Sequence, residues 1–442
     1  MADVNAATDA ASINFLIIGG GLVAVVAAEE IRKRGTGGRI MIVSNDHDRP
    51  YHRPPLSKGY LRGEGNRPDV FVQPANWYAE NAVELVTDTY ATALDPATST
   101  VTLDNGQTLH YRTLLLATGG TPRHLDIPGA DRAGVHYLRS LTDSESLRAA
   151  AAQAKRAVVI GGGFISVEVA AALTTYKVDT TLIVRGTTIW NDLVPSEVAR
   201  FVEQTLSDHG VKLMTEDEAT RILPRGGELH AGSVATKSGH TVAADLVVIA
   251  IGIEPNISLA REAGLALDEA TGGVTVDEYL GTSDPHIYAA GDIASFPDPV
   301  FGRRRVEHWD TAFSQGQTVG ANMAGAHEPY DHVQYVFSDV FDLGIEMLGK
   351  PQASTPTITR GTMESRSFAV LYLDGPQETV TGAFTVNRPG EELDSYRALI
   401  RQQASLAGFE SEAEQHPDED LTGLAPDLDA ADAMEKADPE QE

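Results

Sequence analysis

The sequence predicts an α/β fold made of two Rossmann-like dinucleotide-binding domains and a C-terminal α+β domain. A strand, a glycine turn and a helix follow one another at residues 15–34, and the same pattern returns at residues 157–173. From about residue 328 the pattern changes to short strands separated by turns. A chain of 442 residues is long enough for two or three such domains.

The first unit opens with four apolar residues, Phe15 to Ile18, that run straight into three glycines and an alanine-rich helical segment. Gly19 permits the tight turn, and Gly21 lets the backbone approach a pyrophosphate. The amides and the dipole at the start of the helix favour a bound phosphate. Ala24 stands where the fingerprint has its third glycine, a replacement that should shift the helix slightly without abolishing the site.

An acidic residue and a proline-rich run follow the second predicted strand, residues 39–43. An acid at the position of Asp46 accepts hydrogen bonds from an adenosine ribose, and we favour this role over that of a solvated loop acid. The run from Arg49 to Lys58 holds three prolines, which predict a rigid, non-helical path. Arg53 and Lys58 should therefore be held in place.

The middle of the first unit contains a predicted antiparallel excursion. Residues 83–86 and 99–103 alternate between apolar and polar side chains, and Asn105-Gly106 is typical of a hairpin turn. The chain then returns as a strand at residues 113–117. That strand ends in the sequence ATGGTPR, residues 117–123.

The second unit repeats the glycine turn, with Gly161 and Gly163 at the two close-approach positions and Ser166 in the third. Its further strands are predicted at residues 180–184, 211–214 and 244–251. Two such units in one chain imply two separate dinucleotides.

A short strand at residues 287–292 delivers Asp292 beside a glycine. Its carboxylate could meet a ribityl chain or pyrophosphate, and could also cap the helix that follows. The C-terminal domain is predicted from strands at residues 344–349, 367–373 and 379–386 and a final helix at residues 392–406.

Composition excludes several classes of function. The chain contains no cysteine, so redox-active disulfides, thiolate nucleophiles and cysteine-ligated iron–sulfur clusters are excluded, and we predict no metal site. A net charge of −29 argues against a nucleic-acid partner, because phosphate contacts need clustered Lys and Arg. No run reaches the roughly 18 apolar residues that a membrane helix needs. The start of the chain does not read as a secretion signal, so we expect a soluble, cytoplasmic protein without a membrane partner.

Both ends of the chain are expected to be disordered. Residues 1–12 read as a loose lead. From Glu410 onward the chain holds 13 acidic residues and one lysine, a charge of −12, which leaves −17 for the rest. Such a composition cannot bury a core, so residues 409–442 are predicted to form a disordered tail.

Taken in order, these pieces resemble the two-dinucleotide flavoprotein reductases, and within them the branch of oxygenase-type ferredoxin reductases and apoptosis-inducing-factor-like flavoproteins. The resemblance spans roughly residues 13–405, and EHW followed by FSDVFDLG makes the apoptosis-inducing-factor-like side the nearer match. It rests on GGGLVA with Asp46, RPPLSK at 53–58, ATGGTPR at 117–123, GGGFISVE at 161–168, AAGD at 289–292, RVEHWD at 305–310 and YVFSDVFDLGIEMLG at 335–349.

The resemblance implies a division of the chain into domains. An FAD-binding domain would occupy residues 13–130 and 256–326, with an NAD(P)H-binding domain inserted at 131–255. A C-terminal domain at 327–408 would cover the flavin.

The resemblance also implies site residues. In such enzymes a lysine near flavin N5, here Lys58, pairs with a glutamate, here Glu168, although the residues alone would suggest a surface lysine and a helix-dipole acid. A fixed cation stabilises the negative charge that hydride places on the flavin, and the glutamate favours the charged lysine. The aromatic matching Phe164 lies over the ring until nicotinamide displaces it. Trp309 and Phe337 match aromatics that line the flavin. Further cofactor contacts are expected at Arg53, Thr118, Gly119, Arg123, Ile165, Gly252, Asp292, Glu307 and His308.

The choice of nicotinamide cofactor is expected to depend on the strand end at residues 184–185. Val184 stands where NAD-specific relatives carry a ribose-binding acid, and Arg185 follows it. A lost acid beside a guanidinium accommodates a 2′-phosphate, so the sequence leans slightly to NADPH over NADH.

The implied activity is that of an NAD(P)H-dependent flavoprotein reductase, in which hydride passes to FAD and electrons then pass to an acceptor. The leading acceptor is a [2Fe-2S] ferredoxin, which is usually acidic and would need a basic patch, for which Arg303-Arg304-Arg305 is the candidate. The same three arginines read equally well as a solvated loop. A small acceptor such as a quinone or oxygen, and a redox-sensing NAD(H)-binding interaction module, are the alternatives. A homodimer through the C-terminal domain is expected from fold-level analogy alone.

Overall fold

The structure is a computed structural model, and it describes residues 12–226 and 229–408. The expected disordered lead, apart from Ser12, and the acidic tail lie outside these residues. The described residues form two compact units, each built from three segments. The first comprises residues 12–125, 136–152 and 251–332, and the second comprises residues 126–135, 153–250 and 333–408. The domain boundaries expected from the sequence remain a prediction.

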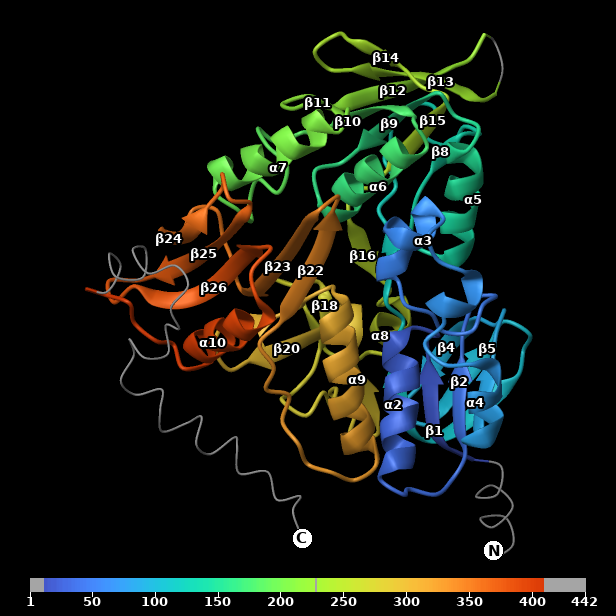
Figure 1. The fold of residues 1–442 in the computed structure, drawn as a ribbon. Helices are drawn as coiled ribbons and strands as arrows, with labels where there is room; N and C mark the ends of the chain where they lie inside the picture. Colours follow the sequence, from blue (N-terminus) through green and yellow to red (C-terminus); the bar gives the residue numbers. More distant parts are fainter. Residues whose placement is uncertain (1–11, 227–228, 409–442) are drawn as a thin grey trace, which may run out of the picture. The chain divides into compact units, whose positions relative to one another are not determined.

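The first unit is built on a parallel sheet in the order β3-β2-β1-β6, with β19 paired to β6. Figure 1 labels β1 and β2 of this sheet, with helix α2 beside them. Its strands are β1 (Ile13–Ile18), β2 (Ile40–Val43), β3 (Val83–Val86), β6 (Thr108–Leu116) and β19 (Ile287–Ala289). The central strands are buried, as is typical of a parallel sheet covered on both faces, and this explains why they read as apolar runs.

The expectation that residues 83–86 belong to an antiparallel excursion is wrong, because β3 pairs in parallel with β2. The excursion consists of β4 (Ala91–Asp95), β5 (Thr100–Leu103) and the first part of β6. The predicted Asn105-Gly106 turn joins β5 to β6. Alternating apolar residues indicate a strand that is half-buried, but they do not identify its neighbour.

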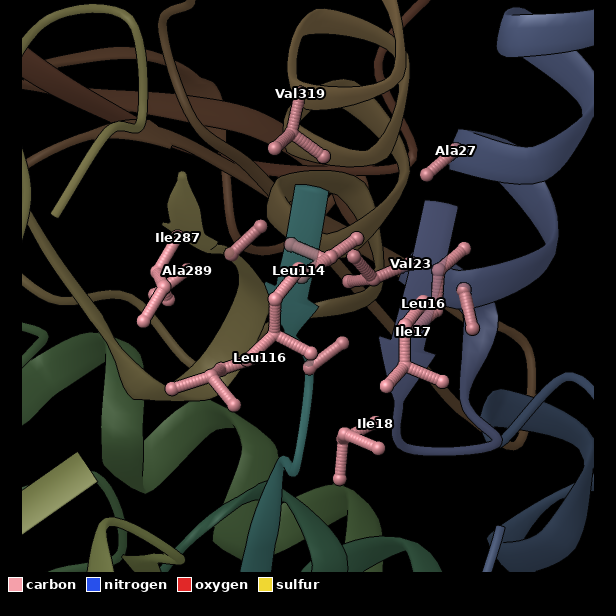
Figure 2. Close-up of a cluster of buried hydrophobic side chains, with 14 of the residues drawn as sticks. Leu16, Ile17, Ile18, Val23, Ala27, Leu114, Leu116, Ile287, Ala289 and Val319 are labelled. Carbon is pink, nitrogen blue, oxygen red and sulfur yellow. The ribbon is translucent and has the colours of Figure 1, made fainter. Parts of the chain in front are cut away.

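Two helices pack closely beside the sheet of the first unit, α2 (Leu22–Lys33) and α9 (Trp309–Met323). A Cβ atom at Gly316 would lie 2.9 Å from Val26 Cβ, and one at Gly320 would lie 2.6 Å from Ala27 O. Small residues therefore set the approach of the two helices. Figure 2 shows the core of this unit, with Leu16, Ile17, Ile18, Val23, Ala27, Leu114, Leu116, Ile287, Ala289 and Val319 gathered from β1, α2, β6, β19 and α9.

Smaller elements complete the first unit. The helical ones are η1 (Pro54–Ser57), α3 (Gly59–Arg62), η2 (Arg67–Val70), α4 (Ala75–Glu80), α5 (Leu141–Ala151), α8 (Ser258–Glu262) and η3 (Gly291–Ile293). The strands are β7 (Gly120–Pro122), β16 (Ile253–Pro255), β17 (Leu267–Asp268), β18 (Gly273–Thr275), β20 (Ala294–Asp298) and β21 (Gly302–Arg304). β8 (Val135–His136) lies at a boundary between the units.

The second unit contains a parallel sheet with β11, β10, β9 and β15 in that order. These strands and their helices are β9 (Arg156–Ile160), α6 (Phe164–Thr175), β10 (Asp179–Ile183), α7 (Ser196–Asp208), β11 (Lys212–Met214) and β15 (Leu246–Ile249). An antiparallel sheet that was not expected from the sequence is formed by β12 (Ala219–Pro224), β13 (Ala231–Thr236) and β14 (Thr241–Ala243).

The same unit includes an antiparallel sheet in the order β22-β23-β26-β25-β24, close to the predicted C-terminal strands. Its elements are β22 (Tyr335–Val340), β23 (Leu343–Gly349), β24 (Thr357–Thr362), β25 (Ser367–Asp374), β26 (Thr379–Val386) and helix α10 (Gly390–Arg401). The expected helix at residues 392–406 runs too far. Gln403 has a φ of 51°, which ends helical geometry, and Ser405 forms a bridge with Thr379.

Candidate functional site

The first glycine turn fits a pyrophosphate. Gly19 has a φ of 126°, and a Cβ atom there would lie 2.0 Å from Ala117 O, so only glycine fits. Gly21 precedes α2, and its position is open, because a Cβ atom added there would have no other atom within 4 Å. The start of α2 has no side-chain cap and no acidic residue in its first turn, so its amides can receive an anion. Ala24 is fully buried, which suits close packing at the third position.

Asp46 follows β2, as the ribose role requires, and its carboxylate is already oriented by protein groups. The Asp48 N–H donates to Asp46 Oδ1 (3.1 Å), and the Tyr51 hydroxyl donates to Asp46 Oδ2 (2.6 Å). Burial raises the pKa of Tyr51, so its hydroxyl keeps its proton and remains a donor. Tyr51 was not among the expected site residues, although it lies inside the proline-rich run.

A cluster of two arginines and one aspartate lies beyond the turn. Arg53 donates to the backbone O of Arg139. The guanidinium of Arg139 donates from Nη2 to Asp292 Oδ2 (2.6 Å) and from Nε to Gly120 O (3.0 Å). Arg53 keeps partial solvent exposure, yet the enclosure of its guanidinium, and then the nearby Arg139, lower its pKa. Gly119 has a φ of 63° and lies beside Arg139. This cationic cluster suits an anionic cofactor, and Arg139 was not expected from the sequence.

The proline-rich run is partly helical, so the expected non-helical path is wrong at residues 54–57. Pro54 and Pro55 occupy the first positions of the 3₁₀ turn η1, where proline is tolerated because the missing N–H has no partner to lose. Ser144 Oγ donates to Leu56 O (2.8 Å) and fixes this turn. Lys58 ends the turn, where its N–H donates to Pro55 O (3.1 Å), and the residue is buried.

Several predicted cofactor residues tie two segments of the first unit together. Thr118 Oγ1 donates to Asn256 O (2.6 Å), and Asn256 Nδ2 donates to Thr118 O (3.0 Å). The Arg123 N–H donates to Gly252 O (2.9 Å), and its Nε donates to Ile253 O (3.0 Å). The described bonds of these residues are structural, and their cofactor contacts remain a prediction.

Trp309 begins α9 and donates from its indole N–H to His52 Nδ1 (3.1 Å). Burial lowers the pKa of His52, which favours the neutral imidazole that this bond needs. His308 caps the helix, and Glu307 pairs with Arg305. His52 is a second residue of the proline-rich run that was not expected at the site.

The three arginines at residues 303–305 do not form the expected basic patch, because their guanidinium groups bind other groups of the protein. The side chains of Arg304 and Arg305 are only 17% and 14% exposed. Arg304 pairs with Asp298, and Arg305 donates to Thr271 O and Asp292 O. Arg303 is more exposed, but its guanidinium also donates to backbone oxygens. The alternative of a solvated loop is wrong as well, since residues 302–304 form β21.

The second glycine turn repeats the first. Gly161 has a φ of 143°, and a Cβ atom there would lie 2.1 Å from Ala250 O. Gly163 precedes α6, which has no side-chain cap and no acid in its first turn. Ser166 is buried and donates to Gly163 O (2.7 Å), which shows how serine replaces the third glycine. Ile165 is 42% exposed, although it is a large apolar residue, as a ligand-facing position would be.

Glu168 lies on α6 and is buried. Ser338 Oγ of β22 donates to its carboxylate (2.6 Å). Phe337, the preceding residue in β22, stacks with Tyr335 at a ring distance of 5.8 Å. Lys58 belongs to the first unit and Glu168 to the second, and their expected pairing remains a prediction. Ser338 was not expected at the site, although it lies in one of the sequence blocks that carry the resemblance.

Val184 is buried and Arg185 exposed at the end of β10. The adjoining loop is held by backbone bonds, in which the Glu216 N–H donates to Gly186 O (2.9 Å) and the Asp217 N–H donates to Val184 O (3.2 Å). The exposed Arg185 guanidinium thus lies directly after β10, the place from which it was predicted to reach a 2′-phosphate.

The two glycine turns and their uncapped helices define a protein that binds two dinucleotides, and the comparisons identify its class as a flavin- and nicotinamide-dependent oxidoreductase. A family model described as pyridine nucleotide-disulphide oxidoreductase matches residues 13–316, and a reductase C-terminal model matches residues 335–422. The chain belongs to the pyridine nucleotide-disulphide oxidoreductase family. It is an FAD- and NAD(P)H-dependent reductase, as the resemblance implied. Because it has no cysteine, it carries no disulfide of the kind in the family's name.

Curated relatives match nearly the whole chain. Rhodocoxin reductase of Rhodococcus erythropolis is 32% identical over 391 residues, covering 88% of this chain and 90% of its own. Putidaredoxin reductase of Pseudomonas putida is 32% identical over 408 residues, with 91% and 96% covered. Monodehydroascorbate reductase 2 of Arabidopsis thaliana is 32% identical over 425 residues, with 90% and 96% covered.

A solved structure agrees with the fold. The ferredoxin reductase for the CYP199A2 system from Rhodopseudomonas palustris has a TM-score of 0.87 and 31% identity, covering 94% of this chain and all of that chain. Among the described residues, no helix is long and apolar enough to cross a bilayer.

Proposed function

We propose that the protein carries electrons from NAD(P)H, through FAD, to a small [2Fe-2S] ferredoxin. The observation that supports this most is the near end-to-end match with rhodocoxin reductase and putidaredoxin reductase, and with a solved protein that is named a ferredoxin reductase. The match includes the C-terminal domain, for which the reductase C-terminal model covers residues 335–422. The acceptor is therefore argued from the whole chain and not from the dinucleotide folds alone.

The first unit would hold FAD, which when bound accepts hydride and releases electrons singly. The amides at Gly21 and the start of α2 would receive its pyrophosphate, and Asp46, oriented by Tyr51, would receive its ribose. Arg53 and Asp292 would contact the remainder. Lys58 would supply positive charge near the reacting ring.

The second unit would hold NAD(P)H at the start of α6, with Gly163 leaving room for its pyrophosphate. Glu168 would favour the charged form of Lys58, and its own charge is supported by the hydrogen bond from Ser338. Phe164 would close the nicotinamide position until the cofactor arrives. Arg185 would receive a 2′-phosphate, which favours NADPH over NADH.

Docking of an acidic ferredoxin is not expected to rely on long-range attraction. The residues before Glu410 carry −17, and Arg304 and Arg305 are engaged internally. Repulsion between two acidic proteins is screened by salt, so the reaction should hold its rate or quicken as ionic strength rises.

A small organic acceptor is the second candidate. Monodehydroascorbate reductase 2 matches the chain over 425 residues at the same 32% identity as putidaredoxin reductase. That name specifies monodehydroascorbate, a small organic acceptor, so overall similarity does not separate reductases of ferredoxins from reductases of small acceptors.

A reductase that consumes NAD(P)H must work where this nucleotide is regenerated, and we infer a cytoplasmic location on that ground.

The deciding experiment is a steady-state acceptor panel run with both NADH and NADPH. A [2Fe-2S] ferredoxin coupled to cytochrome c, a quinone, monodehydroascorbate and oxygen would serve as acceptors. Fastest turnover with the ferredoxin supports the proposal, while faster turnover with a small acceptor replaces it with the second candidate. Slow turnover with all acceptors, together with a persistent long-wavelength band after reduction, would favour the interaction module.

A further inference from the structure

Trp190 lies between β10 and α7 with its backbone in the left-handed region, at a φ of 50°. This conformation is a genuine outlier for a bulky aromatic residue and persists only where the surroundings fix it. The Trp190 N–H donates to Gly162 O in the second glycine turn (2.9 Å). The amide before it, of Ile189, donates to Glu203 Oε1 of α7 (2.9 Å). The segment is thus tied to the glycine turn on one side and to α7 on the other.

The Trp190 side chain is 3% exposed and is held by other rings. Its ring lies 4.9 Å from that of Phe164, at an angle of 33°, and 6.2 Å from that of Phe384 in β26. Its indole N–H has no hydrogen-bond partner in the described part of the chain. A buried tryptophan usually satisfies this group, so the ring is placed by its aromatic contacts and not by hydrogen bonding.

Phe164 is the residue next to the second glycine turn that contacts the Trp190 ring. It is the first residue of α6, directly after Gly163, and it is half-buried. The position of Gly163 is open, with no atom within 4 Å of an added Cβ. The Phe164 ring contacts that of Trp190, and any turn of Phe164 away from Trp190 would give up this contact.

We propose that Trp190 is a positioning residue that holds Phe164 in its resting orientation and so sets how readily NAD(P)H enters. The inference rests on the role proposed above for Phe164. If the resting orientation blocks the nicotinamide, the apparent affinity for NAD(P)H falls by the fraction of molecules in which Phe164 has moved. A contact that stabilises the resting orientation lowers this fraction.

The test is a double-mutant cycle on the FAD-loaded full-length protein, read by anaerobic stopped-flow reduction with NADH and NADPH. Phe164→Leu and Trp190→Leu should each tighten the half-saturation constant of the reductive half-reaction about threefold or more. The double variant should gain no more than either single one, because both remove the same contact. Trp190→Phe should retain most of the wild-type value, and Trp77→Leu, at a partly buried tryptophan of the first unit, is the control.

The outcomes separate the inference from the proposed function. If Phe164→Leu leaves reduction unchanged, the role proposed for Phe164 fails and the inference fails with it. If Phe164→Leu acts but Trp190→Leu does not, or if the two effects add, Trp190 does not position Phe164. Should Trp190→Leu fail to yield FAD-loaded protein, Trp190→Phe answers the same question. It should then give a smaller tightening that disappears in the Phe164→Leu background, and an equal tightening in both backgrounds overturns the inference.

Discussion

The Ser338 hydroxyl donates a 2.6 Å hydrogen bond to the carboxylate of Glu168, and so joins a strand of the C-terminal sheet to the helix that follows the second glycine turn. Both residues are buried. A buried carboxylate needs donors, because losing one leaves part of its desolvation uncompensated. The C-terminal domain therefore takes part in holding a residue that we place in the hydride-transfer step.

Ser338→Ala should weaken that step and the fold together. A hydrogen bond to a charged group contributes about 1.5–3 kcal/mol, so we expect unfolding free energy to fall by an amount of that order. The rate of flavin reduction should fall at the same time, which anaerobic stopped-flow absorbance measures. Ser367→Ala, in the same sheet, removes a hydrogen bond from a partly exposed hydroxyl to Asn387 O and is the control. It should lower the unfolding free energy less and leave the rate of flavin reduction unchanged.

The two glycine turns should be separable by mutation. Gly19→Ala places a Cβ atom 2.0 Å from Ala117 O and should yield protein that does not retain FAD, measured as the ratio of 450 nm to 280 nm absorbance. Gly161→Ala, whose Cβ would lie 2.1 Å from Ala250 O, should retain FAD but bind NAD(P)H poorly. Gly37→Ala is the control and should change neither property, since no atom lies within 4 Å of a Cβ added there. Full flavin content in Gly19→Ala would contradict this assignment.

His52 should make the protein less stable in mild acid. Burial lowers its pKa in the folded state, so as pH falls through the ordinary value of about 6.5 the unfolded state takes up the proton first. The stability contributed by neutral His52, which accepts from Trp309, is present above that pH and is lost as pH falls towards the folded pKa. His52→Gln keeps an acceptor and does not titrate. From pH 8 to pH 5.5 the Tm of the wild type should fall by more than the Tm of His52→Gln. An equal fall in both proteins would refute the stabilising role of neutral His52.

Arg185 should decide the nucleotide if the 2′-phosphate is recognised. Arg185→Gln is expected to lower kcat/KM for NADPH by about tenfold, equivalent to about 1.4 kcal/mol, and to leave NADH unchanged. Arg221→Gln, another exposed arginine of the second unit, is the control. Equal effects on both nucleotides would show that Arg185 does not read the phosphate.

Much of the fold could be predicted from the sequence because parallel strands buried on both faces leave short apolar runs before glycine turns. Strand pairing could not be predicted, as β3 shows, since an edge strand and an antiparallel strand have the same alternation. The sheet of β12, β13 and β14 was missed because its strands are short and partly polar.

The candidate site followed the same division. Gly19, Gly161 and Asp46 could be proposed from the sequence because their chemistry requires a residue type at a fixed distance from a strand. Tyr51, His52, Arg139 and Ser338 act through hydrogen bonds to residues elsewhere in the chain, and only the folded structure brings these partners together. The prediction of a basic patch at residues 303–305 was wrong, because a run of arginines in the sequence does not reveal that their guanidinium groups donate to backbone oxygens.

In the proposed function, this chain seats FAD so that NAD(P)H can reduce it and a ferredoxin can reoxidise it. One anaerobic stopped-flow experiment tests this function, in which the yellow protein is first mixed with NADH or NADPH and then with an oxidised [2Fe-2S] ferredoxin. The 450 nm absorbance should bleach with at least one nucleotide and return as the ferredoxin is reduced. Flavin absorbance that does not bleach with either nucleotide would contradict the proposed function.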